Sequence, residues 1–266
     1  ALIAANHVAN IAPKDGTAIA ALTSMLPYQQ LMGVQSVRFD AVRSNWLPSP
    51  GGYTGVLVVS KNAAAKTFAE LREKEIRIAT MTPGSTPHFY AALFNEVFGT
   101  KMHFVGGHPS MPSTMLAAER GEVDGFPIAP WPTLKRNYAE QLARKEFLAL
   151  LQFGMKRVPE LGDTPFALDF VRSEEDRKLV DIAMAPLVLG YPLMLAPEVP
   201  AERVVALRKA IMDMVRDPAF LAEAEKQTLD IDAVSGEEAQ RIVEAAYASP
   251  ASVVERVRRI YETQMR

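Results

Sequence analysis

Apolar runs of strand length alternate with helical patterns over the middle of the chain. Runs bounded by turn residues predict strands over residues 55–60, 76–81, 102–105, 123–128 and 147–153. Between them, apolar residues recur at helical spacing, which predicts helices over residues 66–74, 87–98, 111–120 and 132–145. This alternation is typical of an α/β protein in which helices cover both faces of a mostly parallel sheet.

The two ends of the chain have a different pattern. The N-terminal part predicts a helix over residues 2–11, a buried strand over 17–22, a short helix over 27–32 and a loop or crossing segment over 45–52. After a loop-like stretch, the C-terminal part predicts a helix over residues 173–185, a short strand over 191–195 and helices over 201–215, 218–226, 236–246 and 252–265. We find no internal repeat.

This order of elements predicts two lobes that are joined by two crossings. The first lobe comprises residues 1–53 plus 190–266, and the second comprises residues 54–189. Clefts between domains, and the carboxyl ends of parallel strands, are where polar groups converge on ligands. We therefore expect a ligand site between the lobes.

The turn after the strand at residues 76–81 is the most informative local motif. Small residues at 82–84 are followed by Ser85 or Thr86 as the N-cap of a helix, with Pro87 suited to its first turn. The free N–H groups and the helix dipole would face an anion. No Lys or Arg lies in the turn and the spacing is not that of a P-loop, which favours a carboxylate over a polyphosphate. The alternative is an ordinary capped turn.

Composition narrows the classes of function. A net charge of -2 argues against a nucleic-acid binder, and the lack of cysteine excludes disulfides and thiol chemistry. Prolines and a glycine interrupt the most apolar stretch, residues 182–197, so no membrane insertion is expected. The histidines lack metal-ligand spacing, and we predict neither metal nor cofactor. The chain starts at Ala1 without a signal-peptide core, so we expect any targeting segment to have been removed or not included.

Several segments, taken in order, carry a family resemblance. They are AANHVANIAPKDGTAIAALTS (4–24), ATMTPGSTPHFY (79–90), LAAERGEVDGF (116–126), PEVPAERVVALRKA (197–210) and DPAFLAEAEKQTLDID (217–232). Together they resemble the substrate-binding proteins of tripartite tricarboxylate transporters, the Bug family, over essentially the whole chain. The resemblance implies a type II periplasmic-binding-protein-like α/β fold whose two lobes close on a small carboxylate. It also implies a periplasmic receptor, not an enzyme, that delivers its ligand to the membrane components of the transporter.

The chain departs from this family at its start. Ahead of the segment at residues 4–24, family members carry a first strand, a glycine-containing loop that contacts the ligand, a helix and a second strand. This chain begins after them. The resemblance therefore implies that part of the first lobe's sheet, and half of the carboxylate clamp, are missing from these residues.

The resemblance also implies particular ligand contacts. In the second lobe they fall on Pro83, Gly84, Ser85 and Thr86, through main-chain N–H groups and hydroxyls, in agreement with the helix-terminus argument. In the first lobe, the residues that match a small polar turn facing the cleft are Thr23 and Ser24, for which an ordinary helix cap is the alternative.

Further candidates lie elsewhere in the chain. Asp124, at the start of a strand, would orient ligand or water, or else accept backbone N–H bonds at the strand end. His108 matches a ligand-facing loop. His88, in the first helical turn, would donate to a carboxylate if protonated, or else occupy a solvated helix position. Trp46 and Trp131 are candidates for stacking on a ligand or for core positions.

Two other classes of protein remain open at this point. A hydrolase would use Ser85 as nucleophile, His88 or His108 as base and Asp124 as orienting residue, although no GxSxG elbow surrounds Ser85. The effector-binding part of a transcription regulator would share the bilobal fold, although the chain carries no helix-turn-helix segment. The predicted cleft has few cations, so a monocarboxylate or an aromatic acid fits as well as citrate.

Overall fold

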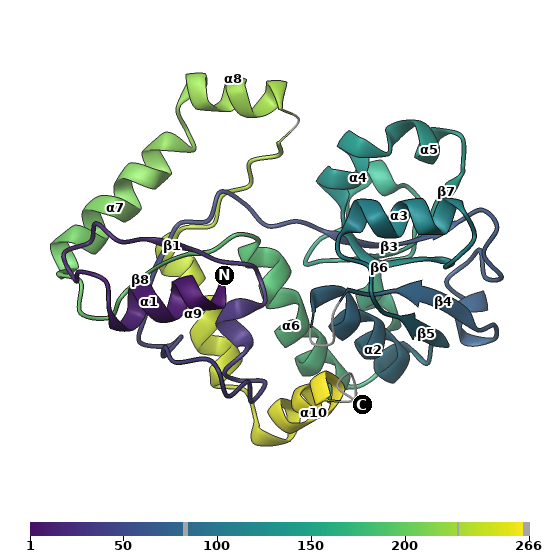
Figure 1. Ribbon diagram of the computed structural model, residues 1–266, viewed down its shortest axis with the longest axis horizontal. Coiled ribbons are helices and arrows are strands. Elements are labelled where there is room, and N and C mark those ends of the chain that lie inside the picture. The colour runs from purple at the N-terminus through teal and green to yellow at the C-terminus, as the bar shows by residue number, and fades with distance from the viewer. Residues whose placement is uncertain (82–84, 228, 263–266) are drawn as a thin grey trace. The chain divides into compact units, whose positions relative to one another are not determined.

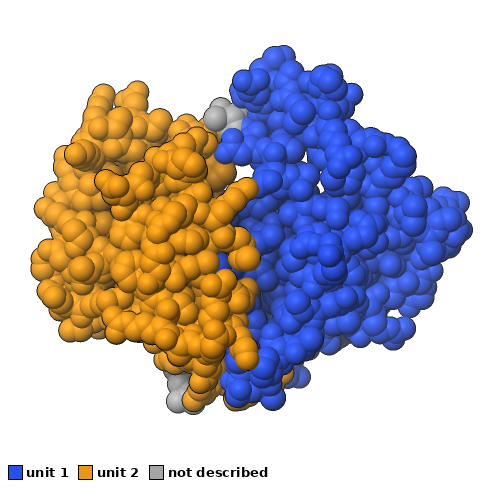
Figure 2. Space-filling model, turned by 180° about the vertical axis from the view of Figure 1, so that it is seen from behind, with its two compact units in different colours: residues 1–53, 182–254 blue, residues 54–181, 255–266 orange. Residues whose placement is uncertain are grey.

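The chain divides into two compact units in a computed structural model that describes residues 1–81, 85–227 and 229–262. Unit 1 comprises Ala1–Tyr53 and Ile182–Val254, and unit 2 comprises Thr54–Asp181 and Glu255–Arg266 (Figure 2). Like the predicted lobes, the units divide after Tyr53. The other divisions fall inside helices, within α6 (Glu174–Leu189) and α10 (Ala251–Glu262).

Unit 2 is built on a mixed sheet with the strand order β5-β4-β6-β3-β7. Its strands are β3 (Gly55–Ser60), β4 (Ile76–Ala79), β5 (Met102–Val105), β6 (Gly125–Pro130) and β7 (Phe147–Phe153). β4 pairs in parallel with β5 and β6, whereas β3 is antiparallel to both β6 and β7. The expectation of parallel pairing is confirmed for β4, β5 and β6 and is wrong at β3, which runs in the reverse direction between β6 and β7.

Helices cover both faces of this sheet. α2 (Thr86–Phe98) and α3 (Met111–Glu119) lie on opposite faces (Figure 1). α2 is buried along most of its length, and the rings of Tyr90 and Phe94 pack 5.5 and 5.3 Å from that of Phe153 on β7. The predicted helix over 132–145 breaks at Tyr138, which has a φ of -133°. The remaining short elements are α4 (Trp131–Asn137), α5 (Ala139–Ala143) and the 3-10 turns η2 (Glu70–Arg72), η3 (Pro159–Leu161) and η4 (Ala167–Phe170).

Unit 1 has a smaller antiparallel sheet with the strand order β1-β8-β2. Its strands are β1 (Ala20–Ala21), β2 (Asn45–Leu47) and β8 (Leu193–Leu195), and its helical elements are α1 (Leu2–Asn10), η1 (Leu26–Tyr28), α7 (Ala201–Met214), α8 (Pro218–Lys226) and α9 (Gly236–Tyr247). β2 lies where the pattern predicted a loop or crossing. Its pairing with β8, more than a hundred residues away, supplies the hydrogen bonds that a local pattern does not reveal.

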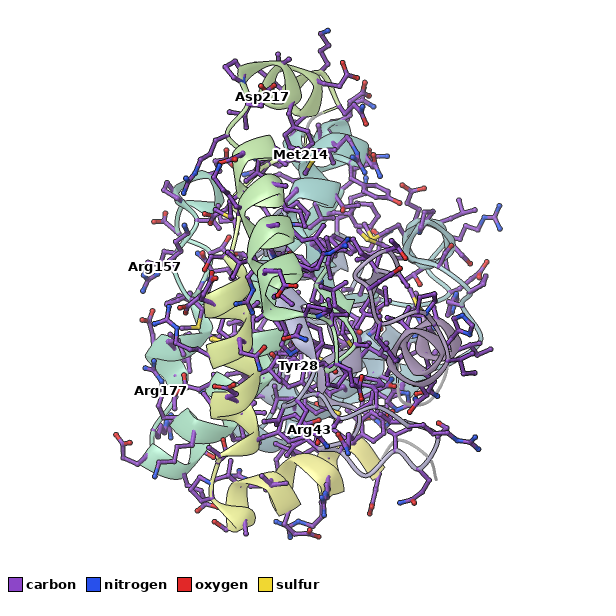
Figure 3. The ribbon with its side chains drawn as sticks, turned by 90° about the vertical axis from the view of Figure 1, so that its left-hand side faces the viewer. Tyr28, Arg43, Arg157, Arg177, Met214 and Asp217 are labelled. Atoms are coloured by element: carbon purple, nitrogen blue, oxygen red, sulfur yellow. The ribbon has the colours of Figure 1, made fainter. Side chains whose placement is uncertain are left out.

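Local interactions fix both the core and the helix ends of unit 1. Trp46 is fully buried and its indole N–H donates to the Ala41 carbonyl at 2.9 Å, so it is a core anchor rather than a ligand platform. Asp217, labelled in Figure 3, caps α8 by accepting from the N–H groups of Ala219 and Phe220 at 2.9 and 3.0 Å. Among the described residues, no helix combines the length and apolar character needed to cross a membrane.

Candidate functional site

The N-terminus of α2 follows the carboxyl end of β4 in unit 2. Ser85 is the N-cap residue, with extended φ and ψ of -72° and 158°, and its carbonyl accepts from the Phe89 N–H at 3.0 Å. The Ser85 side chain makes no capping hydrogen bond. An α-helix has no internal partner for the N–H groups of its first turn, so those of Thr86 and His88 point out of the helix end. Of the predicted site residues, Pro83 and Gly84 lie outside the described part of the chain.

Three side chains around this helix start carry buried polar atoms that have no hydrogen-bond partner among the described residues. They are the hydroxyls of Thr80 and Ser85 and both ring nitrogens of His88. Thr80 is 1% exposed and His88 is 7% exposed. An unsatisfied buried polar group costs about 1–3 kcal/mol, and native proteins contain few of them. A polar ligand that hydrogen-bonds these groups would recover that free energy.

The strand register explains why these groups gather on one face of the sheet. Ile78 pairs with Phe104 in the parallel β4–β5 ladder, and side chains alternate along a strand, so Thr80 lies on the same face as Ile78. Ala79 points the other way, into the core cluster that α3 covers. The His88 ring lies 4.7 Å from the ring of Phe104, which places His88 on the face that carries Thr80.

His88 is a buried residue and not the solvated helix position that the sequence suggested. Burial lowers the pKa of its imidazole below the ordinary value of 6.5, so the ring is neutral at pH 7. A neutral imidazole carries one N–H donor and one acceptor nitrogen. The helix start therefore combines main-chain donors, two hydroxyls and one uncharged imidazole.

Asp124 stabilises the sheet beside this site. Its carboxylate accepts from the Arg77 main-chain N–H at 2.6 Å, and the Arg77 guanidinium lies 3.5 Å away. The Asp124 N–H donates in turn to the Arg77 carbonyl at 2.7 Å, and its carbonyl accepts from the Ser60 N–H at 2.8 Å. These contacts are those of the strand-end alternative, while a role in orienting ligand stays a prediction.

The loop after β5 approaches the end of β4. The Gly107 N–H donates to the Met81 carbonyl at 3.3 Å, so the loop that carries His108 runs beside the strand that leads to α2. His108 is partly exposed. Trp131, the second tryptophan candidate, donates its indole N–H to the Glu160 carboxylate at 2.6 Å.

The predicted residues of unit 1 lie directly after β1. The Thr23 carbonyl accepts from the Leu26 N–H at 3.0 Å, at the start of η1. Ser24 is buried and its side chain hydrogen-bonds the hydroxyl of Tyr53, whose pKa burial raises to about 12. The Tyr53 ring lies 6.5 Å from that of Tyr191. Ser24 therefore lies beside a pair of tyrosines.

Sequence reasoning missed this tyrosine pair and also Thr80. Tyr53 and Tyr191 each follow a glycine in one of the two predicted crossings, and that repeated Gly-Tyr is the signal that was available. The glycines are needed for close approach: a Cβ on Gly190, which has a φ of +58°, would lie 2.0 Å from the Gly51 carbonyl oxygen. Thr80 had no comparable signal.

Comparison with known proteins identifies the fold. No protein-family model and no curated protein matches the sequence. A solved TctC solute-binding protein from Polaromonas, without ligand, has a TM-score of 0.68 at 16% identity and covers 95% of this chain and 80% of that one. Rpa4515 from R. palustris, with adipate, has a TM-score of 0.64 at 20% identity over 98% and 82% of the two chains. The chain has the fold of these solute-binding proteins.

A third structure gives the same result. MatC (Rpa3494) from Rhodopseudomonas palustris, with bound malate, has a TM-score of 0.63 at 14% identity and covers 98% of this chain and 84% of that one. The predicted α/β fold of periplasmic-binding-protein type is thereby confirmed. Among the described residues, no group of three or more His, Asp or Glu side chains could hold a metal ion.

Proposed function

We propose that this protein is a periplasmic solute-binding receptor of the Bug family that captures a small carboxylate and delivers it to the membrane components of a tripartite tricarboxylate-type transporter. The fold shared with the TctC solute-binding protein supports this, as do the sequence segments that resemble the family in order. Adipate and malate, in the two ligand-bound structures, are both dicarboxylates.

The observation that carries the proposal is the uncapped start of α2. Ser85 is a capping residue that does not cap, and its hydroxyl, the Thr80 hydroxyl and the His88 imidazole are buried without partners among the described residues. The N-terminus of a helix carries about half a positive charge, which favours an anion. A carboxylate at this point accepts several hydrogen bonds at once, each of about 1.5–3 kcal/mol when the acceptor is charged.

In the proposed mechanism, the two lobes close on the ligand. The carboxylate binds first to the α2 terminus and is then bridged by the first lobe through Thr23 and Ser24, beside Tyr53. Closure requires that the ligand bind the closed state more tightly than the open one, which bonds from both lobes provide. The membrane components would recognise the closed form.

The same contacts favour binding over catalysis. A Ser-His-Asp relay needs a base that is hydrogen-bonded to the serine and to an orienting carboxylate. Ser85 and His88 share no hydrogen bond in the structure, and the carboxylate of Asp124 is bound to Arg77. A site of donors without an activated nucleophile binds an anion and releases it unchanged.

A calorimetric screen of mono-, di- and tricarboxylates, including adipate and malate, tests the proposed function. We expect saturable binding of at least one carboxylate, with one ligand per chain. A matching rise in the thermal midpoint with ligand concentration would confirm binding to the folded state. If a folded preparation binds none of these carboxylates, the receptor function is wrong, and hydrolysis of ester substrates would then favour the enzyme alternative.

A further inference from the structure

We propose that His88 contacts the bound carboxylate and takes up a proton when the carboxylate binds, so that ligand capture is linked to proton uptake at this imidazole. The inference rests on the proposed function and adds to it a ligand contact and a pH dependence. Its geometric basis is a 7%-exposed imidazole in the first turn of α2 whose two nitrogens both lack a partner among the described residues.

His88 lies next to the proposed anion site at the start of α2. It is the third residue of α2, three after Ser85, so both side chains lie on the same side of the first turn. Phe104 packs against the ring from β5 at 4.7 Å and contributes no polar atom. Neither ring nitrogen bonds another described residue, so the neutral ring has one N–H donor for an anion above the helix end.

The partial positive charge of the helix end and the negative charge of the ligand have opposite effects on the protonation of His88. Without ligand, burial and the positive end of the helix dipole both favour the neutral ring. A bound carboxylate brings a full negative charge to hydrogen-bonding distance, which exceeds the charge of about one half at the helix end. The carboxylate therefore raises the pKa of His88, and the bound ring takes up a proton near neutral pH.

Other charged groups around His88 do not dominate this balance. On α2 the nearest is Glu96, which pairs with Arg256 of α10 at 3.1 Å, and Arg256 also pairs with Asp176 at 2.7 Å. Arg259 of α10 lines the same cavity as Glu96 and Phe104. These charges largely offset one another, and burial alone accounts for the lowered pKa of His88.

The strands that pack against α2 add few further charged groups near His88. On β4, Arg77 is engaged with Asp124. On β5, His103 is neighbour to Phe104 and so points to the opposite face, where it lies 3.2 Å from Glu75. β6 has no titratable residue, and His108 belongs to the loop after β5. His103 is therefore a matched control for His88 on the same unit.

The sign of the pH dependence follows from linkage. Because the bound state holds its proton to a higher pH than the free state, affinity increases as pH falls through the bound pKa of His88. The increase stops below the free pKa, and its steepest value is about tenfold per pH unit for one proton. Protonation of the ligand itself opposes the trend only near the carboxylic pKa of about 4–5.

Calorimetry of adipate and malate binding at about pH 6.5, in two buffers with different ionisation enthalpies, measures this proton directly. We expect the wild type to take up a substantial fraction of one proton per ligand. The His88→Gln variant keeps an N–H donor but does not titrate, so it should bind with almost no uptake. The His103→Gln variant should behave like the wild type.

Several results would overturn the inference. Carboxylate binding by the wild type without proton uptake contradicts it while leaving the receptor function intact, and so does uptake that persists in His88→Gln. Failure of the wild type to bind any carboxylate contradicts both proposals. Should His88→Gln not fold, NMR titration of the imidazole Cε1–H signals in the wild type replaces it. The inference then requires one buried histidine whose pKa rises when adipate or malate is added.

Discussion

The starts of α2 and α3 are built from the same local sequence pattern but end in different states. Each helix follows one of two neighbouring parallel strands, β4 or β5, and each has a serine N-cap and a proline as its second residue. At α3 the Ser110 hydroxyl accepts from the Ser113 N–H at 3.4 Å, and the Thr114 hydroxyl donates to the Ser110 carbonyl at 3.2 Å. At α2 the Ser85 hydroxyl is buried without a partner among the described residues.

The difference supports the proposed binding site at the start of α2. In α3, the Ser110 hydroxyl accepts from a main-chain N–H group of the first turn, so that N–H group is not free to bind an anion. In α2 the corresponding third position is His88. The Ser85 hydroxyl makes no capping hydrogen bond, and this hydroxyl and the His88 ring nitrogens are buried. Under the proposed function, a bound ligand would satisfy these unpaired polar groups, and functional sites commonly lower stability in this way.

The largest expected effect comes from placing a negative charge in each helix start. Thr86→Glu should weaken carboxylate binding by about a hundredfold or more, because two like charges about 4 Å apart repel strongly at partly buried sites. Ser113→Glu should complete a capping box with Ser110 and leave affinity unchanged. Calorimetric affinities and thermal midpoints of both variants check the pair, and equal losses of affinity would erase the distinction between the helices.

Removing the serine hydroxyls should give smaller effects, on affinity at Ser85 and on stability at Ser110. Ser85→Ala should reduce affinity by about tenfold, the lower end for a hydrogen bond to a charged group, with little change in stability. Ser110→Ala removes a working N-cap and should lower the free energy of unfolding by about 1 kcal/mol without changing affinity. Denaturant titration and calorimetry measure both quantities. An unchanged affinity in Ser85→Ala contradicts the assignment of that residue.

Removing a threonine hydroxyl near each helix start should change the free energy of unfolding by about 1 kcal/mol or less. Thr80→Val removes a buried hydroxyl that has no partner among the described residues, so the variant should be as stable as the wild type or more so. Thr114→Val removes a hydroxyl that donates to Ser110 and should destabilise the protein by about 1 kcal/mol. Chemical denaturation distinguishes them, and destabilisation by Thr80→Val would mean that its hydroxyl has an internal partner.

The smallest expected effect is a pH dependence of stability in the absence of ligand. Burial lowers the pKa of His88 in the folded state, so the unfolded chain binds a proton more readily below about pH 6.5. The contribution of His88 to stability should therefore be full above that pH and decline as the pH falls toward the folded pKa. We expect the difference in thermal midpoint between the wild type and His88→Phe to be constant from about pH 6.5 to 8. Below about pH 6.5 the midpoint of the wild type should fall relative to that of the variant. Parallel curves would show that His88 does not titrate.

Much of the fold could be predicted because its strands are short apolar runs between strong turns. β3, β5 and β7 match the predicted ranges residue for residue. The reversed direction of β3 could not be predicted, because a strand buried on both faces has the same composition in either direction. β2 was missed because its three residues form a strand only through pairing with β8.

The site was predictable in its backbone and not in its side chains. The N-cap at Ser85 and Pro87 in the first helical turn were both in the local sequence. The burial of His88 depends on Phe104 from another strand, and the place of Thr80 depends on the β4–β5 register. The contact between Ser24 and Tyr53 joins residues nearly thirty positions apart. Contacts of this kind arise from packing and leave no periodic signal.

The most direct test of the central claim is to follow the main-chain amides of both helix starts by NMR while adipate or malate is added. Binding at α2 predicts large shifts and slowed hydrogen exchange at the Thr86 and His88 N–H groups, because these would donate to the carboxylate. The Met111 and Ser113 N–H groups at the start of α3 should not change. Saturable binding that leaves the Thr86 and His88 amides unaffected would contradict the account.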